Sequence, residues 1–242
     1  MFGFRLSVKC AAAVLLAGLM ASGVSALEAQ STHRTRRESN ANRKARIART
    51  IEDTYTRRWE VGGGGGYLRF RSGENLQRNN QVSFWTSGTY FLNPKLGITG
   101  DVRGSYGNAK IGNTIFNIPN PQISQYTFMG GPTYRVWTKE KTAISIFGVG
   151  GAAIGKFDSG AKGLTSADIH VWQSNTRPAF SLGANFDYNF YPNLAVRVTP
   201  TYLGTFFRMD PNDTSTSSRG SIQNNLGVNV GLVYRFGRIK QR

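Results

Sequence analysis

The chain contains 242 residues, a length typical of one domain or of one domain with an extension. Its 30 lysines and arginines exceed its 13 acidic residues and give a formal net charge of +17, although charged residues make up only 18% of the chain. One cysteine and two histidines exclude a disulfide scaffold and a zinc site built from these residue types. A mean hydropathy of −0.34 argues against a helical membrane protein. The 29 glycines and 12% aromatic residues favour an all-β chain.

The first 26 residues have the layout of a secretory signal peptide. Arg5 and Lys9 supply the positive region, an apolar run covers residues 10–20, and residues 24–26 have the small-x-small form of a cleavage site. The apolar run is shorter than the roughly 20 residues that a transmembrane helix needs. We therefore expect cleavage after Ala26 and a mature chain without cysteine.

Residues 27–58 are expected to form a basic arm. They carry nine lysines and arginines against four acidic residues, and they contain few large apolar residues. Ile47, Ile51 and Tyr55 recur at intervals of four residues, which indicates a weak helical stripe. The sequence therefore predicts a solvated arm that is helical in part.

From Trp59 onwards, apolar residues alternate with small or polar ones, which indicates strands and not helices. Strands are predicted, in chain order, over residues 59–71, 81–92, 96–106, 123–136, 142–155, 180–190, 194–206 and 226–236. Most are clearly longer than the 5–6 residues of ordinary strands and close to what a tilted membrane strand requires.

The connections between the predicted strands alternate in length. Short connections cover residues 93–95, 137–141 and 191–193, long ones cover 107–121, 156–176 and 207–220, and 72–80 is intermediate. An even number of antiparallel strands, with tight turns at one end and long loops at the other, is the layout of an outer-membrane barrel.

The position of the aromatic residues decides which face of the strands points outward. A soluble lipocalin-like barrel would place the apolar face inside. Here aromatic residues occur near both ends of the apolar face, at Trp59, Tyr67, Tyr106, Tyr126, Tyr134, Phe190, Tyr234 and Phe236. Two aromatic bands that flank an aliphatic middle are typical of the girdles of membrane barrels. The sequence therefore predicts an all-β fold, an eight-stranded antiparallel up-and-down transmembrane β-barrel over 59–236, between a basic N-terminal periplasmic arm and a basic tail at 237–242.

The end of the last predicted strand carries a family resemblance. The sequence Val233-Tyr234-Arg235-Phe236 is similar to the C-terminal signature of Gram-negative outer-membrane barrels, and the eight-strand pattern resembles the small OmpA/OmpX-type barrels. The resemblance implies an outer-membrane location, contact with outer-membrane lipid and recognition by the barrel-insertion machinery. One departure is that Phe236 is followed by six further residues.

The polar face of the strands carries charges of both signs. These residues are Glu60, Asp101, Arg103, Arg135, Asp187, Arg197 and Arg235. A turn centred on Pro192 places Asp187 opposite Arg197, and closure of the barrel brings Glu60 near Arg235. Because an eight-stranded interior is just wide enough to be filled by side chains, we expect a plug of ion pairs and no wide channel. A gated pore for small ions is the alternative.

The basic residues gather on the side that the prediction assigns to the periplasm. The predicted basic rim consists of Arg43, Lys44, Arg46, Arg49, Arg57, Arg58, Arg238 and Lys240. Such a rim is attracted to anionic surfaces, so peptidoglycan and anionic inner-leaflet lipid are the expected partners of the arm. Nucleic acid is not expected, because the compartment is wrong.

The sequence does not indicate an enzyme or a cofactor. Some outer-membrane barrels are lipid A-modifying enzymes or proteases, and the one histidine after the arm, His170, lies in a long loop with Asp168 and Ser174 nearby. Catalysis needs these groups within hydrogen-bond reach, which a long loop does not ensure. The five glycines at 62–66 lack the Lys-Ser/Thr of a phosphate-binding loop and are expected to form a strongly curved first strand.

Overall fold

The computed structural model describes residues 39–111, 121–159, 161, 163–209 and 222–239. The predicted signal peptide, the first part of the arm and Lys240 lie outside these residues. The chain divides into two units, Met1–Ala45 and Arg46–Arg242. In the first unit the described residues begin helix α2 (Asn40–Tyr55), and Ser39 caps this helix because its Oγ accepts a hydrogen bond from the backbone N–H of Asn42.

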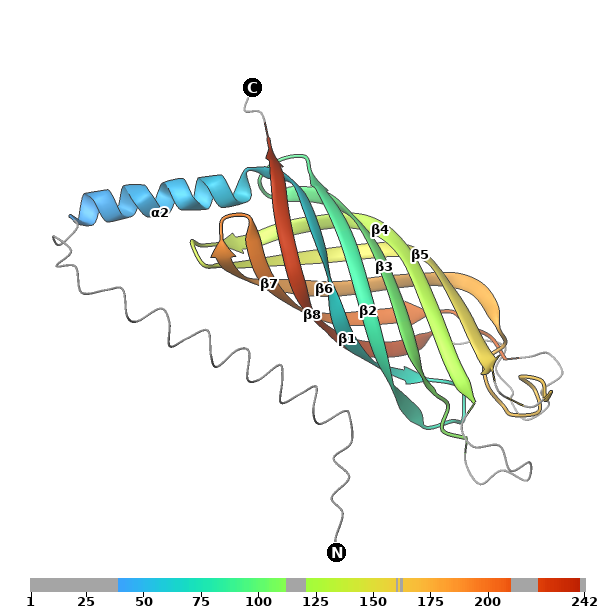
Figure 1. Cartoon of the computed structure of the whole chain (residues 1–242). Helices are drawn as coiled ribbons and strands as arrows, with labels where there is room; N and C mark the ends of the chain where they lie inside the picture. The colour runs from blue at the N-terminus through green and yellow to red at the C-terminus, as the bar shows by residue number, and fades with distance from the viewer. Residues whose placement is uncertain (1–38, 112–120, 160, 162, 210–221, 240–242) are drawn as a thin grey trace, which may run out of the picture. The chain divides into compact units, whose positions relative to one another are not determined.

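The second unit contains eight strands that form one closed antiparallel barrel. They are β1 (Arg57–Arg71), β2 (Arg78–Phe91), β3 (Leu96–Asn108), β4 (Gln122–Thr138), β5 (Thr142–Ser159), β6 (Asn175–Tyr191), β7 (Leu194–Thr205) and β8 (Gln223–Arg238). Each strand pairs with the next in sequence, and β8 closes on β1 (Figure 1). The predicted eight-stranded up-and-down barrel is therefore confirmed.

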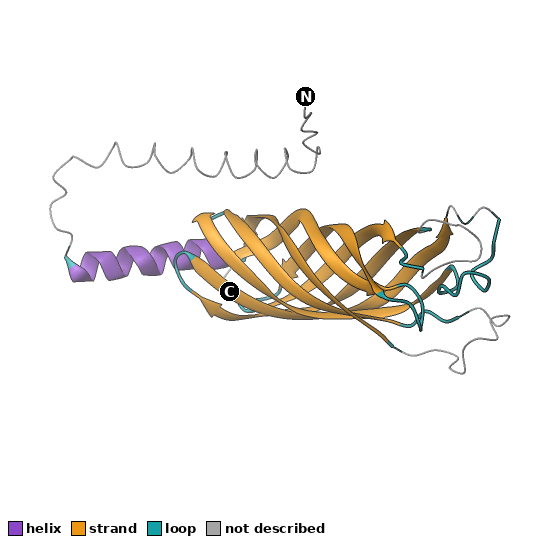
Figure 2. Ribbon diagram, turned by 90° about the horizontal axis from the view of Figure 1, so that it is seen from below, coloured by secondary structure: helices purple, strands orange, loops and turns teal. Residues whose placement is uncertain are grey.

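The two ends of the barrel differ in their connections, as Figure 2 shows. At one end, here called the turn end, two to four residues join β2 to β3, β4 to β5 and β6 to β7. At the other end, here called the loop end, the connections are longer. Strand β1 begins at Arg57, two residues before the predicted start, and β5 continues to Ser159 because Phe157 extends its inward-facing apolar positions.

Side chains alternate between the lumen and the outside along every strand. In β8, Asn225, Asn229 and Arg235 are buried in the lumen, whereas Leu226 and Leu232 are more than half exposed on the outer face. The barrel therefore has an apolar exterior and a lumen that contains many polar and charged side chains, which is typical of membrane barrels. No helix among the described residues is long and apolar enough to cross a membrane.

The glycine run at 62–66 lies in the middle of β1, where this strand pairs with β8. Gly64 pairs with Gly231, and a Cβ atom on Gly64 would lie 2.2 Å from the carbonyl oxygen of Val230. Glycine is required here because the backbones of β1 and β8 approach closely.

Candidate functional site

Five charged side chains meet in the lumen near the turn end, and all five are buried. They are Glu60, Arg135, Asp187, Arg197 and Arg235. They come from five strands, β1, β4, β6, β7 and β8. The register places Glu60 opposite Arg235 and Asp187 opposite Arg197. We call this group the ionic plug.

Two carboxylates hold the ionic plug together. Asp187 accepts two parallel hydrogen bonds from Arg197, at 2.6 and 2.8 Å, a bidentate geometry that is strong and directional. Glu60 accepts hydrogen bonds from Arg235 at 2.9 Å, from Arg135 at 3.2 Å and from Arg197. Arg235 also donates to Asp187, so every carboxylate is shared between arginines.

Three arginines and two carboxylates leave an excess positive charge in the ionic plug, and backbone carbonyl groups take up part of it. Nη1 of Arg135 donates to the carbonyl oxygens of Tyr55 and Pro94, both at 3.1 Å. Its guanidinium carbon also lies 3.5 Å from the ring centroid of Phe91, where the aromatic quadrupole stabilises a cation. The guanidinium of Arg135 therefore has hydrogen-bond acceptors and an aromatic partner, which a buried charge requires.

Tyr55, the last residue of α2, is buried at the turn end beside the ionic plug. The centroid of its ring lies 5.3 Å from the guanidinium carbon of Arg135 and 5.6 Å from that of Arg235. Its hydroxyl donates to the carbonyl oxygen of Lys139 at 2.9 Å and accepts from Nδ2 of Asn189 at 2.8 Å. Burial raises the pKa of this phenol above its ordinary value of 10.0, so it stays protonated and able to donate.

The sequence did not single out Tyr55 as a lumen residue. The sequence pattern indicates Tyr55 only as the third member of the helical stripe formed with Ile47 and Ile51. These two isoleucines are half-buried in the structure, whereas Tyr55 is 4% exposed. An aromatic residue at the junction of a helical pattern and an alternating pattern was the available signal.

Asp101 and Arg103 form an ion pair apart from the ionic plug, so the charged residues predicted for the lumen form two groups. They lie two residues apart on the lumen face of β3, and Nε of Arg103 donates to Asp101 at 2.7 Å. The pair is local because residues at i and i+2 share one face of a strand. A cavity of about 20 Å³, room for about one water molecule, separates this pair from Arg197 of the ionic plug.

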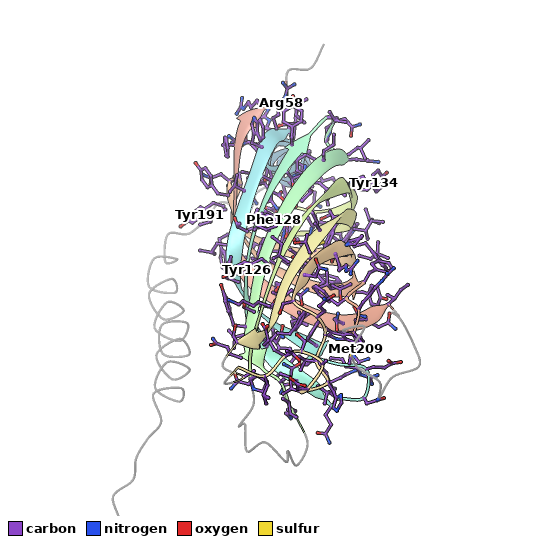
Figure 3. The ribbon with its side chains drawn as sticks, turned by 90° about the vertical axis from the view of Figure 1, so that its right-hand side faces the viewer. Arg58, Tyr126, Phe128, Tyr134, Tyr191 and Met209 are labelled. Atoms are coloured by element: carbon purple, nitrogen blue, oxygen red, sulfur yellow. The ribbon has the colours of Figure 1, made fainter. Side chains whose placement is uncertain are left out.

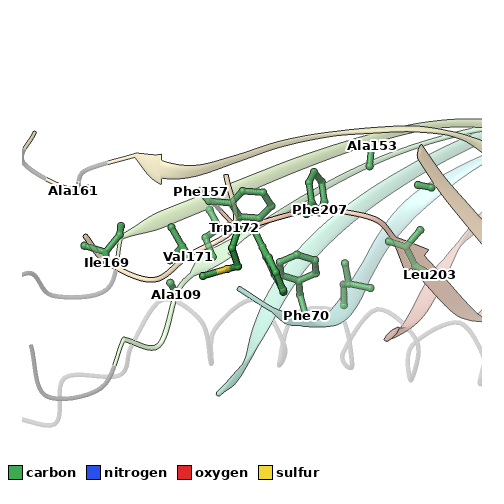
Figure 4. Close-up of a cluster of buried hydrophobic side chains, with 14 of the residues drawn as sticks. Phe70, Ala109, Ala153, Phe157, Ala161, Ile169, Val171, Trp172, Leu203 and Phe207 are labelled. Atoms are coloured by element: carbon green, nitrogen blue, oxygen red, sulfur yellow. The ribbon is translucent and has the colours of Figure 1, made fainter. Parts of the chain in front are cut away.

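A second cluster of buried side chains lies at the loop end and is apolar. Phe157 contacts Phe207 edge to face at 4.8 Å and stacks on Phe70 at 5.9 Å. Trp172, from the connection between β5 and β6, is 2% exposed and donates through Nε1 to the carbonyl oxygen of Arg71 at 2.6 Å. Figure 4 shows these side chains together with Ile169 and Val171 from the same connection, all of them buried. We call this group the apolar cap.

The residues of the predicted basic rim have different surroundings. Arg57 and Arg238 both form ion pairs with Asp53 at 3.0 Å, and Arg46 lies 3.9 Å from Glu140. Arg43 and Lys44, in the first unit, are exposed, as is Arg49 on α2. The guanidinium of Arg58 lies over the ring of Tyr90. Lys240 lies outside the described residues. Acidic residues of the rim are thus already engaged by arginines.

The eight residues of the predicted aromatic girdle all lie on the outer face. Each is at least 36% exposed, and neighbouring members contact one another across strands, as Trp59 and Phe236 do at 6.4 Å. Figure 3 shows Tyr126 and Tyr134 on β4, on either side of Phe128, between Arg58 at the turn end and Met209 at the loop end. The two girdle positions therefore bracket an apolar zone on the exterior.

The loop residues considered as catalytic are engaged elsewhere. The Ser174 hydroxyl donates to Asp158 at 2.9 Å, and Asp168 accepts two hydrogen bonds from Thr165, which lower the pKa of that carboxyl. His170 is exposed and has a positive φ of 54°. In the part of the chain that the structure describes, no group of three histidine, cysteine or acidic residues is placed to hold a metal ion.

Comparisons with known proteins identify the fold. No family model and no curated protein matches the sequence. Among solved structures, Neisserial surface protein A is similar over 74% of this chain and 97% of its own, with a TM-score of 0.51 and 12% identity. The attachment invasion locus protein Ail of Yersinia pestis (TM-score 0.48, 18% identity, 74% of this chain and 99% of that chain) and OprG of Pseudomonas aeruginosa (0.48, 13%, 77% and 99%) also match. The chain thus has the fold of the small outer-membrane barrels.

Proposed function

We propose that this protein is a non-enzymatic outer-membrane barrel with a closed lumen, which anchors a basic arm at the periplasmic side of the membrane. In this proposal the turn end, where α2 leads into β1 and where β8 ends, faces the periplasm and the loop end faces outward. The role is structural, with its interactions on the surfaces of the barrel and on the arm.

The observation that supports this proposal is that buried side chains of different chemistry gather at the two ends of the lumen. Ion pairs between buried residues fill the turn end, and packed aromatic side chains fill the loop end. Bonded guanidinium and carboxylate groups leave the turn end without free charges to attract ions. Packed aromatic rings in the apolar cap cannot replace the hydration shell of a passing ion.

Conductance in planar bilayers tests the closed lumen. The mature chain, folded in detergent and added to both compartments, is expected to leave the membrane at baseline conductance. Insertion is checked separately, by protection of the strands from protease in vesicles. Stable conductance at the level of a general porin would contradict the proposal.

A narrow passive pore is the second candidate, and the small cavity beside Asp101 and Arg103 is the observation that favours it. The cavity is lined by polar side chains together with Trp85 and Phe147, and it adjoins Arg197 of the ionic plug. At about 20 Å³ it has room for about one water molecule and not for a continuous water column. A pore therefore requires both the ionic plug and the apolar cap to move. Planar-bilayer recording would show such movement as brief, rare increases in conductance.

Binding of the arm to anionic surfaces of the periplasm is the proposed interaction at the turn end. Arg49, together with Lys95 and Lys141 in or beside the turns, is exposed or half-exposed and adds to the charge that attracts such a surface. The full mature chain is expected to co-sediment with purified peptidoglycan sacculi at low salt and to dissociate as salt screens the charges. This part of the proposal would be contradicted if the chain did not co-sediment with sacculi, or if co-sedimentation did not decrease as the salt concentration rises.

A further inference from the structure

The outward faces of β1 and β2 change from apolar to cationic at one level near the loop end. On β1 the outward residue Tyr67 is followed by Arg69 and Arg71, and on β2 Arg78 precedes the outward, 75% exposed Val82. Tyr67 pairs with Val82, whereas Arg71 pairs with Arg78. The three arginines therefore lie directly beyond the apolar zone of the exterior. We call them the arginine cluster.

Tyr67 marks the boundary between the two zones. Its ring is part of the aromatic girdle, and its hydroxyl donates to Oδ1 of Asn80, the residue that pairs with Arg69. An aromatic ring with its polar end turned this way is typical of the boundary between hydrocarbon and headgroups. The arginine cluster then lies at the level of lipid headgroups.

Within the described part of the chain, the arginine cluster has no ion-pair partner. Arg71 and Arg78 face each other across the strand pair, an arrangement of like charges that destabilises a sheet. Among the described residues, no carboxylate forms an ion pair with any of the three arginines, whereas Arg57 and Arg238 at the turn end share Asp53. An external anion would remove this repulsion.

The cations are concentrated on this side of the barrel. At the corresponding outward positions, the described parts of β3, β4, β6 and β8 carry neutral residues, namely Asn108, Gln122, Ser124, Thr176 and Asn224. Lys156 on β5, Lys110 beyond the end of β3 and Arg208 beyond the end of β7 are exposed cations, each on a different part of the rim. A general attraction to the membrane surface would not require three arginines on two adjacent strands.

A cavity adjoins the arginine cluster at the rim. It measures about 80 Å³ and is lined by Arg71, Arg78, Trp172, Ile222 and Asn224, with Glu74 as its one acidic residue. Two guanidinium groups beside an indole and an aliphatic side chain suit a ligand that has both anionic and apolar parts.

We propose that Arg69, Arg71 and Arg78 bind the phosphate groups of a phosphorylated glycolipid in the outer leaflet of the membrane. The guanidinium fork matches the phosphate oxygens bidentately, and the apolar strand face next to it is placed to contact the acyl chains of the same lipid. A lipid fits better than a soluble anion because the arginines point outward, along the membrane-facing side of β1 and β2. The inference rests on the proposed placement of the barrel in the outer membrane.

The test titrates the folded mature chain in a neutral detergent with four probes. These are lipid A with two phosphates, dephosphorylated lipid A, phosphatidylglycerol and inorganic phosphate. The first variant carries Arg69→Gln, Arg71→Gln and Arg78→Gln. The matched control, with Lys95→Gln, Lys139→Gln and Lys141→Gln, loses the same charge at the turn end.

Bisphosphorylated lipid A is expected to bind about tenfold or more tightly than the other three probes, because each charge-assisted hydrogen bond stabilises the complex. The arginine variant is expected to lose this preference and the lysine variant to keep it. Equal binding of the lipid A forms, equal loss in both variants, or inorganic phosphate binding as tightly as lipid A would overturn the inference. Circular dichroism of the barrel and protease protection in vesicles are measured alongside, so that a failure of the membrane placement is seen separately.

Discussion

Asp187 is buried and accepts hydrogen bonds from two arginines, and this makes it a sensitive residue of the ionic plug. Asp187→Asn would leave Arg197 and Arg235 with a neutral partner. Removing one partner of a buried ion pair costs about 3–5 kcal/mol, so the free energy of unfolding is expected to fall by about that amount. Urea titration of the barrel in lipid vesicles measures it.

Arg238 supplies the control for this substitution. It also forms an ion pair, at 3.0 Å from Asp53, but its side chain is 74% exposed. Exposed ion pairs contribute about 0–1 kcal/mol, so Arg238→Gln is expected to change little. If Asp187→Asn were as mild as Arg238→Gln, the ionic plug would not contribute to stability as its burial implies.

Tyr55 fixes the end of α2 to the barrel, so its removal should release the arm. Tyr55→Ala deletes the ring between the two arginines and both hydrogen bonds of the hydroxyl. Limited trypsin digestion is expected to cut at Arg46 and Arg49 faster in this variant, with the barrel still protected, because local opening exposes these bonds. Thr50→Ala, which removes a hydroxyl bonded within the helix, should leave the rate unchanged; equal rates in all three proteins would contradict the role of Tyr55.

The pairing of β1 with β8 depends on glycine at the scale of the strand. Gly64→Ala places a Cβ 2.2 Å from a carbonyl oxygen of β8, whereas Gly88→Ala on β2 meets nothing within 4 Å. Overpacking costs about 1–3 kcal/mol, so Gly64→Ala is expected to lower the free energy of unfolding by that amount and Gly88→Ala to leave it unchanged or raise it slightly. Similar stabilities of the two variants would show that the β1–β8 pairing has room to relax.

The strands could be predicted from sequence because the two faces of this barrel differ so strongly. Alternation fixes which residues share a face, and short turns fix the register, so the positions of Asp187 and Arg197 followed from a turn at Pro192. Closure of β8 on β1 similarly placed Glu60 near Arg235.

Other features of the lumen could not be predicted, because they depend on segments without a period. Tyr55 reaches the ionic plug from a helix, and Trp172 reaches the apolar cap from a long connection. Neither alternation nor turn length says where such residues fold back. The separation of Asp101 and Arg103 from the plug follows from a local pairing on one strand, which competes with pairing across the lumen.

At the scale of the whole molecule, the proposed function puts two closures in series, the ionic plug and the apolar cap, and this predicts how the lumen can be opened. An ion that passes the turn end still meets the apolar cap, and one that passes the cap still meets the ionic plug. Opening either closure alone is therefore expected to leave conductance near baseline, while opening both should produce a measurable ion current.

The plug is opened by Glu60→Ser with Arg235→Ser, a directly bonded pair whose joint removal leaves no unpaired carboxylate at this position. The cap is opened by Trp172→Ser with Phe207→Ser. Single-channel recording on the two double variants and on their combination separates the possibilities. A current from the plug variant alone would mean that the cap is permeable, and a current from the cap variant alone would mean that the ion pairs do not block. Because an ion must pass both closures in turn, the current of the combined variant should exceed the sum of the other two.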